Sequence, residues 1–170
     1  MDSDDVCGLP SGGSVPIAAR ATPPEGAPPG LPSRVVATAP AVELIRELVG
    51  RHGPVMFHQS GGCCDGSAPM CYPDGEFRVG QRDVLVGELV LAGDGAVDGG
   101  EPVRVWISGT QFETWKHTQL VLDAIPGRGS GFSLENPTGR RFLSRARTFT
   151  PDEQELLDAH PPRTGADLEE

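Results

Sequence analysis

The feature that most constrains this chain is a glycine- and cysteine-rich break that follows a short apolar run. The run Val55–Gln59 has the length and composition of a buried strand. The segment 60–71 after it holds three of the four cysteines of the chain and includes Gly61, Gly62, Gly66 and Pro69. These residues exclude a helix or a continued strand. The sequence therefore predicts an irregular loop at a strand end, where binding sites are often built.

Apolar residues upstream of this break recur with the period of a helix. Ala41, Leu44, Ile45, Leu48 and Val49 share one face of a helix. Thr38 and Pro40 are typical of a helix start, and Gly53-Pro54 is typical of a helix end. The sequence predicts an amphipathic helix that leads directly into the Val55–Gln59 strand.

The segments beyond the loop read mainly as strands. Residues 83–91 and 103–108 are joined by a glycine-rich connection and predict an antiparallel pair. Residues 119–126 and 132–135 predict two further strands, and residues 110–117 a brief helix. Thr150, Pro151 and Glu153 form the pattern of a capping box, which predicts a helix over 151–159. The pattern as a whole is that of an α+β fold.

The composition divides the chain into a single domain and two flanks. Residues 1–33 contain seven prolines and no apolar periodicity, and we expect a disordered Pro/Gly-rich tail that includes Cys7. Residues 34–150 form the single α+β domain, and residues 151–170 a short acidic helix and disordered tail. The net charge is −3 for residues 1–33, −1 for 34–149 and −6 for 150–170, so the acidity belongs to the flanks.

The same composition argues against two classes of partner. Nucleic acid binding needs a basic face, and the local cluster of Arg140, Arg141, Arg145 and Arg147 is more typical of a solvated helix face. No apolar run approaches the roughly 20 residues that span a bilayer, and the N-terminus lacks the pattern of a signal peptide. We therefore expect no nucleic acid and no membrane partner, and a cytoplasmic protein with reduced thiols.

The order of these elements resembles the A-type iron–sulfur carriers of the HesB/IscA-like fold. The resemblance rests on the Gly61-Gly62-Cys63 loop after a helix and a strand, and on the segment 131–137, Gly-Phe-Ser-Leu-Glu-Asn-Pro. It implies a small, mostly antiparallel sheet with an N-terminal helix and short packed helices. Those carriers also use a C-terminal Cys-Gly-Cys pair, whereas this chain has Arg140–Arg145 without cysteine. Only Cys63 matches a ligand position of that family.

A second resemblance is closer and covers nearly all of residues 35–145. The segment 57–67, Phe-His-Gln-Ser-Gly-Gly-Cys-Cys-Asp-Gly-Ser, with Pro69-Met70, resembles the bacterial domain-of-unknown-function family 779. Genes of that family are often found beside aldehyde dehydrogenase genes. The resemblance implies an accessory role in aldehyde or alcohol oxidation, with an aldehyde or alcohol dehydrogenase as partner, and supplies no catalytic residue.

The loop cysteines favour a metal site. Cys63, Cys64 and Cys71, with His58, offer ligands for zinc, iron or an iron–sulfur cluster. The spacing lacks a Cys-x-x-Cys pair and a second Cys/His pair downstream, so a site shared across a homodimer would supply the missing ligands. The sequence predicts a non-enzymatic accessory protein that binds a metal or iron–sulfur species.

Three alternatives remain open at this point. The first is thiol redox chemistry by a vicinal Cys63–Cys64 disulfide or by pairs with Cys71. A variant has one cysteine as a nucleophile assisted by His58 or Asp65. The second is a metal-free protein-interaction module. The third is that the cysteines are small buried hydrophobes in a turn.

Overall fold

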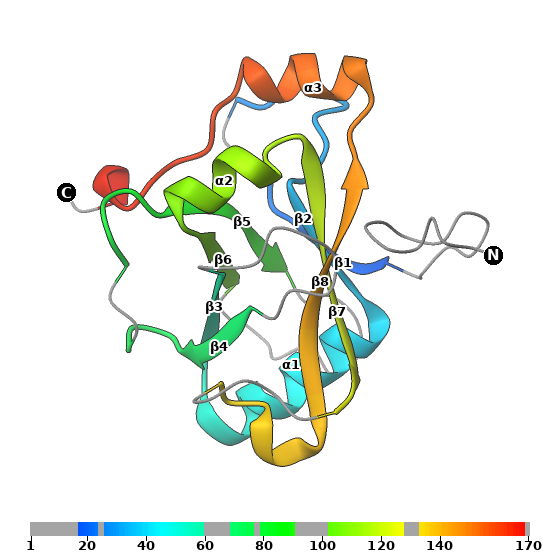
Figure 1. Ribbon diagram of the computed structural model, residues 1–170, viewed down its shortest axis with the longest axis vertical. Coiled ribbons are helices and arrows are strands. Elements are labelled where there is room, and N and C mark those ends of the chain that lie inside the picture. The colour runs from blue at the N-terminus through cyan, green and yellow to red at the C-terminus, as the bar shows by residue number, and fades with distance from the viewer. Residues whose placement is uncertain are drawn as a thin grey trace.

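The protein folds around one mixed β-sheet (Figure 1). The computed structural model describes residues 17–23, 26–59, 69–76, 79–90, 102–127 and 133–168. In these ranges the strands are β1 (Ile17–Ala21), β2 (Val35–Thr38), β3 (Val55–Gln59), β4 (Met70–Pro73), β5 (Val84–Val90), β6 (Val103–Ile107), β7 (Thr118–Pro126) and β8 (Arg140–Thr148). The helices are α1 (Ala39–His52), α2 (Gly109–Trp115) and α3 (Pro151–Asp158), with short 3-10 turns η2 (Asn136–Thr138) and η3 (Ala166–Leu168).

The strands follow the order β4-β3-β6-β5-β1-β2-β7-β8 across the sheet. The pairs β3–β6 and β2–β7 are parallel, and the remaining neighbours are antiparallel. Each parallel pair joins strands that are far apart in the sequence, because parallel neighbours cannot be linked by a tight hairpin. The β5–β6 pair is antiparallel, as the sequence predicts.

The sheet curls until strands near its two ends face each other. Phe57 on β3 and Phe142 on β8 stack edge to face, with ring centroids 4.7 Å apart. The Ser144 hydroxyl on β8 donates a hydrogen bond to the Gln59 side-chain carbonyl on β3. The backbone N–H of Leu134, just before β8, donates to the Cys71 carbonyl on β4 at 3.0 Å. We call this contact between the β3–β4 hairpin and the segment 133–144 the seam; the sheet is a curled half-barrel with its core inside.

Helix α1 fills much of the inner face of the curled sheet. Its apolar stripe, with Leu44, Ile45 and Leu48 almost fully buried, joins one cluster with side chains from most of the strands. Fully burying one such side chain favours folding by about 1.5–3 kcal/mol. The predicted start and end are confirmed: the Thr38 hydroxyl accepts a hydrogen bond from the Ala41 N–H, and Gly53 is the C-cap with φ 84°.

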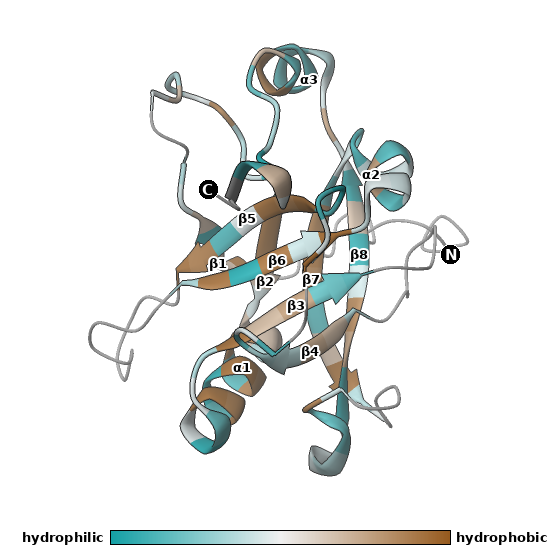
Figure 2. Cartoon of the chain, turned by 90° about the vertical axis from the view of Figure 1, so that its left-hand side faces the viewer, coloured by the Kyte–Doolittle hydropathy of each residue, from teal (hydrophilic) through white to brown (hydrophobic). Residues whose placement is uncertain are grey.

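The two shorter helices flank the sheet. In α3 the predicted capping box is confirmed, because Thr150 and Glu153 each accept from the other's backbone N–H. In α2 the Ser108 hydroxyl caps the first turn and Trp115 is the buried residue. Figure 2 shows α2 largely in hydrophilic colours, as expected for a helix that buries one large side chain. None of the helices in the described ranges is long and apolar enough to cross a membrane.

The fold predicted by the HesB/IscA-like resemblance is wrong. Two strands, β1 and β2, precede the first helix, so α1 is not an N-terminal helix packed on a small sheet. The sheet has eight strands among the described residues, is mixed, and curls on itself. The prediction failed because helical and strand periodicity shows which elements form, whereas the parallel pairings depend on contacts between distant segments.

Three local expectations also change. The arginines expected on a helix face lie on strand β8, where the side chains of Arg145 and Arg147 contact Asp123 and Glu153 respectively. Residues 133–135, expected in a strand, form a turn that leads into η2. The predicted N-terminal tail contributes β1, which is held by backbone pairing with β2 and β5 rather than by an apolar pattern.

Candidate functional site

The cysteine loop is the connection of the β3–β4 hairpin. Phe57 pairs with Cys71 and His58 with Met70, so the two ends of the loop lie side by side. Residues 60–68, which include Cys63 and Cys64, lie outside the described residues, as does Cys7. The structure therefore describes the strands that carry the loop, together with the candidate ligands His58 and Cys71.

Strand alternation puts His58 and Cys71 on opposite faces of the hairpin. Phe57 and Cys71 belong to the main core on the inner face, whereas Met56 belongs to a second cluster with Leu85 and Trp106 on the outer face. His58 follows Phe57, so its side chain points to the outer face. The structure therefore does not bring these two predicted metal ligands together.

Cys71 is fully buried at the seam. Its side chain is 0% exposed, its N–H donates to the Ser133 hydroxyl at 2.8 Å, and its carbonyl accepts from the Leu134 N–H. Burial raises the pKa of the Cys71 thiol well above its ordinary value, and the nearby Glu135 carboxylate raises it further. The thiol is therefore held in its neutral form, which is a poor nucleophile and a poor metal ligand.

Glu135 is a buried acid that the sequence does not single out. Its side chain is 1% exposed, accepts a hydrogen bond from the Ser133 hydroxyl, and lies 3.5 Å from the N–H of Phe142. Burial raises the pKa of Glu135, an effect that the hydrogen bonds from Ser133 and Phe142 partly offset. A carboxylate just before an Asn-Pro turn gives no periodic signal, so only the seam reveals its position.

Gln59 completes the polar part of the seam. It is 1% exposed, and its side-chain carbonyl accepts from the Ser144 hydroxyl. Among the described residues its Nε2 has no hydrogen-bond partner. An unsatisfied buried donor costs about 1–3 kcal/mol, so a partner for this N–H group outside the described residues would stabilise the base of the cysteine loop.

His58 contacts an acid on the outer face. Its Nε2 lies 3.1 Å from Oδ1 of Asp83, and Oδ2 of Asp83 accepts from the Gly80 N–H at 2.7 Å. The side chain of His58 is 5% exposed and that of Asp83 is 15% exposed. The pair ties the turn before β5 to strand β3, and a carboxylate on one ring nitrogen also fixes the orientation of the imidazole.

No group of three or more His, Cys, Asp or Glu side chains arranged to hold a metal ion occurs in the described part of the chain. The predicted set of Cys63, Cys64, Cys71 and His58 stays a prediction, because two of its members fall in 60–68. Cys71 lies on the sealed inner face, and His58 contacts the Asp83 carboxylate on the outer face.

Comparison with known families gives one clear match. The model of the domain of unknown function DUF779 matches residues 44–148, which is more than half of the chain and spans α1 through β8. Neither the curated proteins nor the solved structures gave a match to this chain. The matched region contains the cysteine loop, both of its strands and the seam, and the resemblance predicted from the loop motif is confirmed: the chain belongs to the DUF779 family.

Proposed function

We propose that this protein is a cytoplasmic accessory protein that binds a metal ion or an iron–sulfur species through its cysteine loop. The observation that carries the proposal is that the loop closes a hairpin whose two strands are anchored in the core by Phe57 and Cys71. Such an anchor fixes the two strand ends that the loop joins, and the proposal takes Cys63 and Cys64, adjacent in the sequence of that loop, as its thiol ligands. Thiolates are preferred ligands of zinc, copper(I) and iron–sulfur clusters.

The described residues narrow the ligand set. Cys71 is buried as a neutral thiol beside a carboxylate, and His58 already contacts Asp83. We therefore assign the main ligand role to Cys63 and Cys64. Two thiolates leave a tetrahedral site incomplete, and a second copy of the chain would supply the other two. The metal-bound form in this proposal is a homodimer.

The competing functions are distinguished by the same residues. A disulfide between Cys71 and either loop cysteine would need a sealed, neutral thiol to react, and its burial weighs against this form of redox chemistry. A vicinal Cys63–Cys64 disulfide and a metal-free interaction module do not involve Cys71. Both are outcomes of the experiment below.

The test is elemental analysis by inductively coupled plasma mass spectrometry, with a free-thiol count, on tag-free protein purified without oxygen. We expect about one zinc ion per two chains, or iron in cluster stoichiometry. The metal should be lost in Cys63→Ser and in Cys64→Ser. Cys7→Ser is the matched control outside the family match and should keep it, as should Cys71→Ser after its fold is checked by circular dichroism.

Each other outcome contradicts the proposal in a defined way. Absence of metal from every preparation rejects metal binding. Two thiols that disappear in air and return with reductant, without metal, favour the vicinal disulfide. If Cys71→Ser lost the metal while Cys63→Ser and Cys64→Ser kept it, the metal site would lie at the seam, and the assignment of Cys63 and Cys64 as ligands would be rejected.

The dehydrogenase partner is the part of the proposal that rests on the family resemblance. The experiment is size-exclusion chromatography of the purified protein with an aldehyde dehydrogenase whose gene neighbours that of a DUF779 family member. We expect a shared elution peak that is lost in the Cys63→Ser variant. Separate elution at micromolar concentrations of both proteins contradicts a stable complex.

A further inference from the structure

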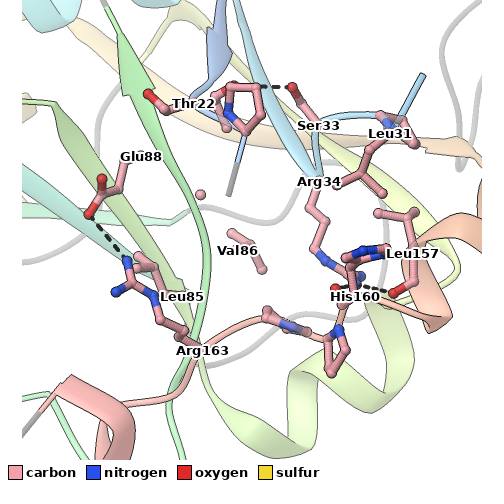
Figure 3. Close-up of a pocket in the computed structure, with 16 residues that line it drawn as sticks. Thr22, Leu31, Ser33, Arg34, Leu85, Val86, Glu88, Leu157, His160 and Arg163 are labelled. Atoms are coloured by element: carbon pink, nitrogen blue, oxygen red, sulfur yellow. Dashed lines mark hydrogen bonds and ion pairs between the residues drawn. The ribbon is translucent and has the colours of Figure 1, made fainter. Parts of the chain in front are cut away.

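A cleft of about 520 Å³ lies against the edge of β5, outside the hairpin and the seam (Figure 3). Its walls come from residues 21–23 and 31–34, from β5, from Leu157 in the last turn of α3 and from residues 160–163. Ligand sites in proteins typically have volumes of about 300–1,000 Å³. The cleft is therefore large enough for a small organic molecule.

The floor of the cleft is a gap in the pairing of β5. On this edge the Thr22 N–H donates to the Glu88 carbonyl at 3.0 Å, and the Leu85 N–H donates to the Arg163 carbonyl at 2.9 Å. Val86 and Gly87 lie between these two bonds and line the cleft. A Cβ on Gly87 would lie 2.6 Å from a methyl of Val35, so this close packing requires glycine. The floor is fixed by the fold.

Arg34 supplies a positive charge that is only partly used. Its Nη2 donates to the carbonyls of Leu157 and His160 at 3.0 and 3.1 Å, and thereby holds the end of α3. A guanidinium carries five N–H donors, and the hydrogen bonds of Arg34 within the described residues come from Nη2, while the guanidinium carbon lies 5.6 Å from the centre of the Phe112 ring. No ion pair in this part of the chain includes Arg34. Burial lowers the pKa of Arg34, an effect that the charge of Asp158 partly offsets.

Asp158 acts on Arg34 without an ion pair to it within the described residues, and the acid in the cleft lining is matched by other arginines. Glu88 is the acid in the lining, and its Oε2 lies 3.1 Å from Nε of Arg104 and 4.0 Å from Nη2 of Arg163. Its negative charge is therefore already matched by two arginines. Figure 3 shows Arg34 and the Glu88–Arg163 pair on opposite sides of the cleft, with Val86 between them. A ligand in the cleft meets a cation at one side and an apolar floor in the middle.

We propose that this cleft binds a small organic carboxylate. The carboxylate oxygens would accept hydrogen bonds from the N–H groups on Nε and Nη1 of Arg34, and the apolar body would lie on Val86 and against Leu31 and Leu157. Arg–carboxylate hydrogen bonds are charge-assisted and directional, which suits a half-buried guanidinium already fixed by two carbonyls. The proposal is independent of metal binding by the cysteine loop.

The test is a titration followed by ¹⁵N–¹H correlation spectra, which report binding at the amides of Val86 and Gly87. The probes are hexanoate and benzoate, their neutral counterparts hexanamide and benzamide, and inorganic phosphate. We expect hexanoate and benzoate to shift the backbone amide signals of Val86 and Gly87. Both should bind at least about tenfold more tightly than hexanamide and benzamide, because the neutral ligands cannot form the charge-assisted hydrogen bonds.

Substitutions of single arginines test whether Arg34 supplies the positive charge that binds the carboxylate. Arg34→Gln should weaken benzoate binding by about tenfold or more. Arg163→Gln keeps the hydrogen bond from the Leu85 N–H to the backbone carbonyl of residue 163, and it should weaken benzoate binding by about two- to threefold. Arg51→Gln is the matched control, an exposed arginine on α1, and should bind like the parent protein. Because Arg34 also holds the end of α3, the comparison of benzoate with benzamide in the parent protein stands even if Arg34→Gln does not fold.

Several results would overturn the proposal. One is equal affinity for carboxylates and amides, which would leave only an apolar pocket. Another is phosphate binding as tight as benzoate binding, which would indicate a general anion site. A third is no shift at Val86 and Gly87 with any carboxylate at about 20 mM, the concentration that detects even millimolar affinity.

Discussion

The two faces of the β3–β4 hairpin hold their polar residues in different ways. On the inner face Cys71 and Gln59 are sealed beneath the seam, with exposed fractions of 0% and 1%. On the outer face His58 contacts Asp83, whose side chain reaches solvent and also binds the Gly80 N–H. Both faces belong to the same two strands, and the loop with Cys63 and Cys64 joins them.

The difference between the two faces indicates which side chains of the hairpin can take part in chemical reactions. A buried polar group with few partners is costly to ionise, so the inner face favours neutral forms. A partly exposed carboxylate such as that of Asp83 can orient a histidine by direct contact. The hairpin therefore combines a rigid, neutral anchor on one side with a polar contact on the other.

The largest expected effect separates the two faces by stability. Phe57→Ala removes the ring that stacks on Phe142 and opens a cavity at the seam. It should lower the free energy of unfolding by about 3–5 kcal/mol, whereas Met56→Ala on the outer face should lower it by about 2 kcal/mol. Urea denaturation followed by tryptophan fluorescence measures both. An equal or greater loss for Met56→Ala would mean that the seam is not tightly packed.

A smaller effect concerns the pH dependence of the inner face. The pKa of Glu135 is raised by burial above its ordinary value of 4.5, so the stability it supports is present below that pH and is lost as pH rises through the raised value. Glu135→Gln removes this loss. The stability of the variant relative to the parent should therefore increase from about pH 4 to about pH 7, with a slope below about 1.4 kcal/mol per pH unit.

Glu153 on α3 provides the control of opposite sign. Its pKa is lowered, first by the hydrogen bond from the Thr150 backbone and then by the contact with Arg147. The stability it supports is present above its ordinary pKa and is lost as pH falls. Glu153→Gln should therefore become less stable relative to the parent as pH rises from the acid side to its ordinary pKa of 4.5, with little further change above about pH 5. If the stability of both variants relative to the parent changed in the same direction with pH, the raised pKa of buried Glu135 would be contradicted.

The smallest effect is the coupling between Gln59 and Ser144. Either Gln59→Met or Ser144→Ala leaves one buried polar group without its partner and should cost about 1 kcal/mol. The double variant removes both groups, and also an Nε2 that has no partner among the described residues, so its stability should lie close to that of the parent. A double-mutant cycle by urea denaturation measures this coupling. Additive losses would show that the two side chains do not interact.

Local sequence signals predicted the elements of this fold better than their arrangement. The ends of α1 and the capping box at Thr150 were predictable because the residues that form them are neighbours in the chain. The parallel pairs β3–β6 and β2–β7 join strands separated by other strands, and no local pattern encodes them. The short strands β2 and β4 gave no alternation long enough to read. The HesB/IscA-like expectation failed for these reasons.

The candidate site was predictable in part. The sequence marked the loop and its two neighbours His58 and Cys71, because cysteines on a glycine loop are unusual. It did not show that the loop closes a hairpin, so the alternation that separates His58 from Cys71 stayed hidden. Glu135 and Ser144 reach the seam only because the sheet curls. The sequence also did not indicate a binding role for Arg34, because the position of its guanidinium depends on hydrogen bonds to the distant end of α3.

The reactivity of Cys71 in the folded protein reports whether the inner face of the hairpin is sealed. After removal of metal by a chelator, the protein is treated with N-ethylmaleimide and the modified cysteines are identified by peptide mass spectrometry. We expect Cys63 and Cys64 to react and Cys71 to stay unmodified until the protein is denatured, because the Cys71 thiol is fully buried and neutral. Modification of Cys71 at the rate of the loop cysteines would contradict the sealed inner face and the ligand assignment that depends on it.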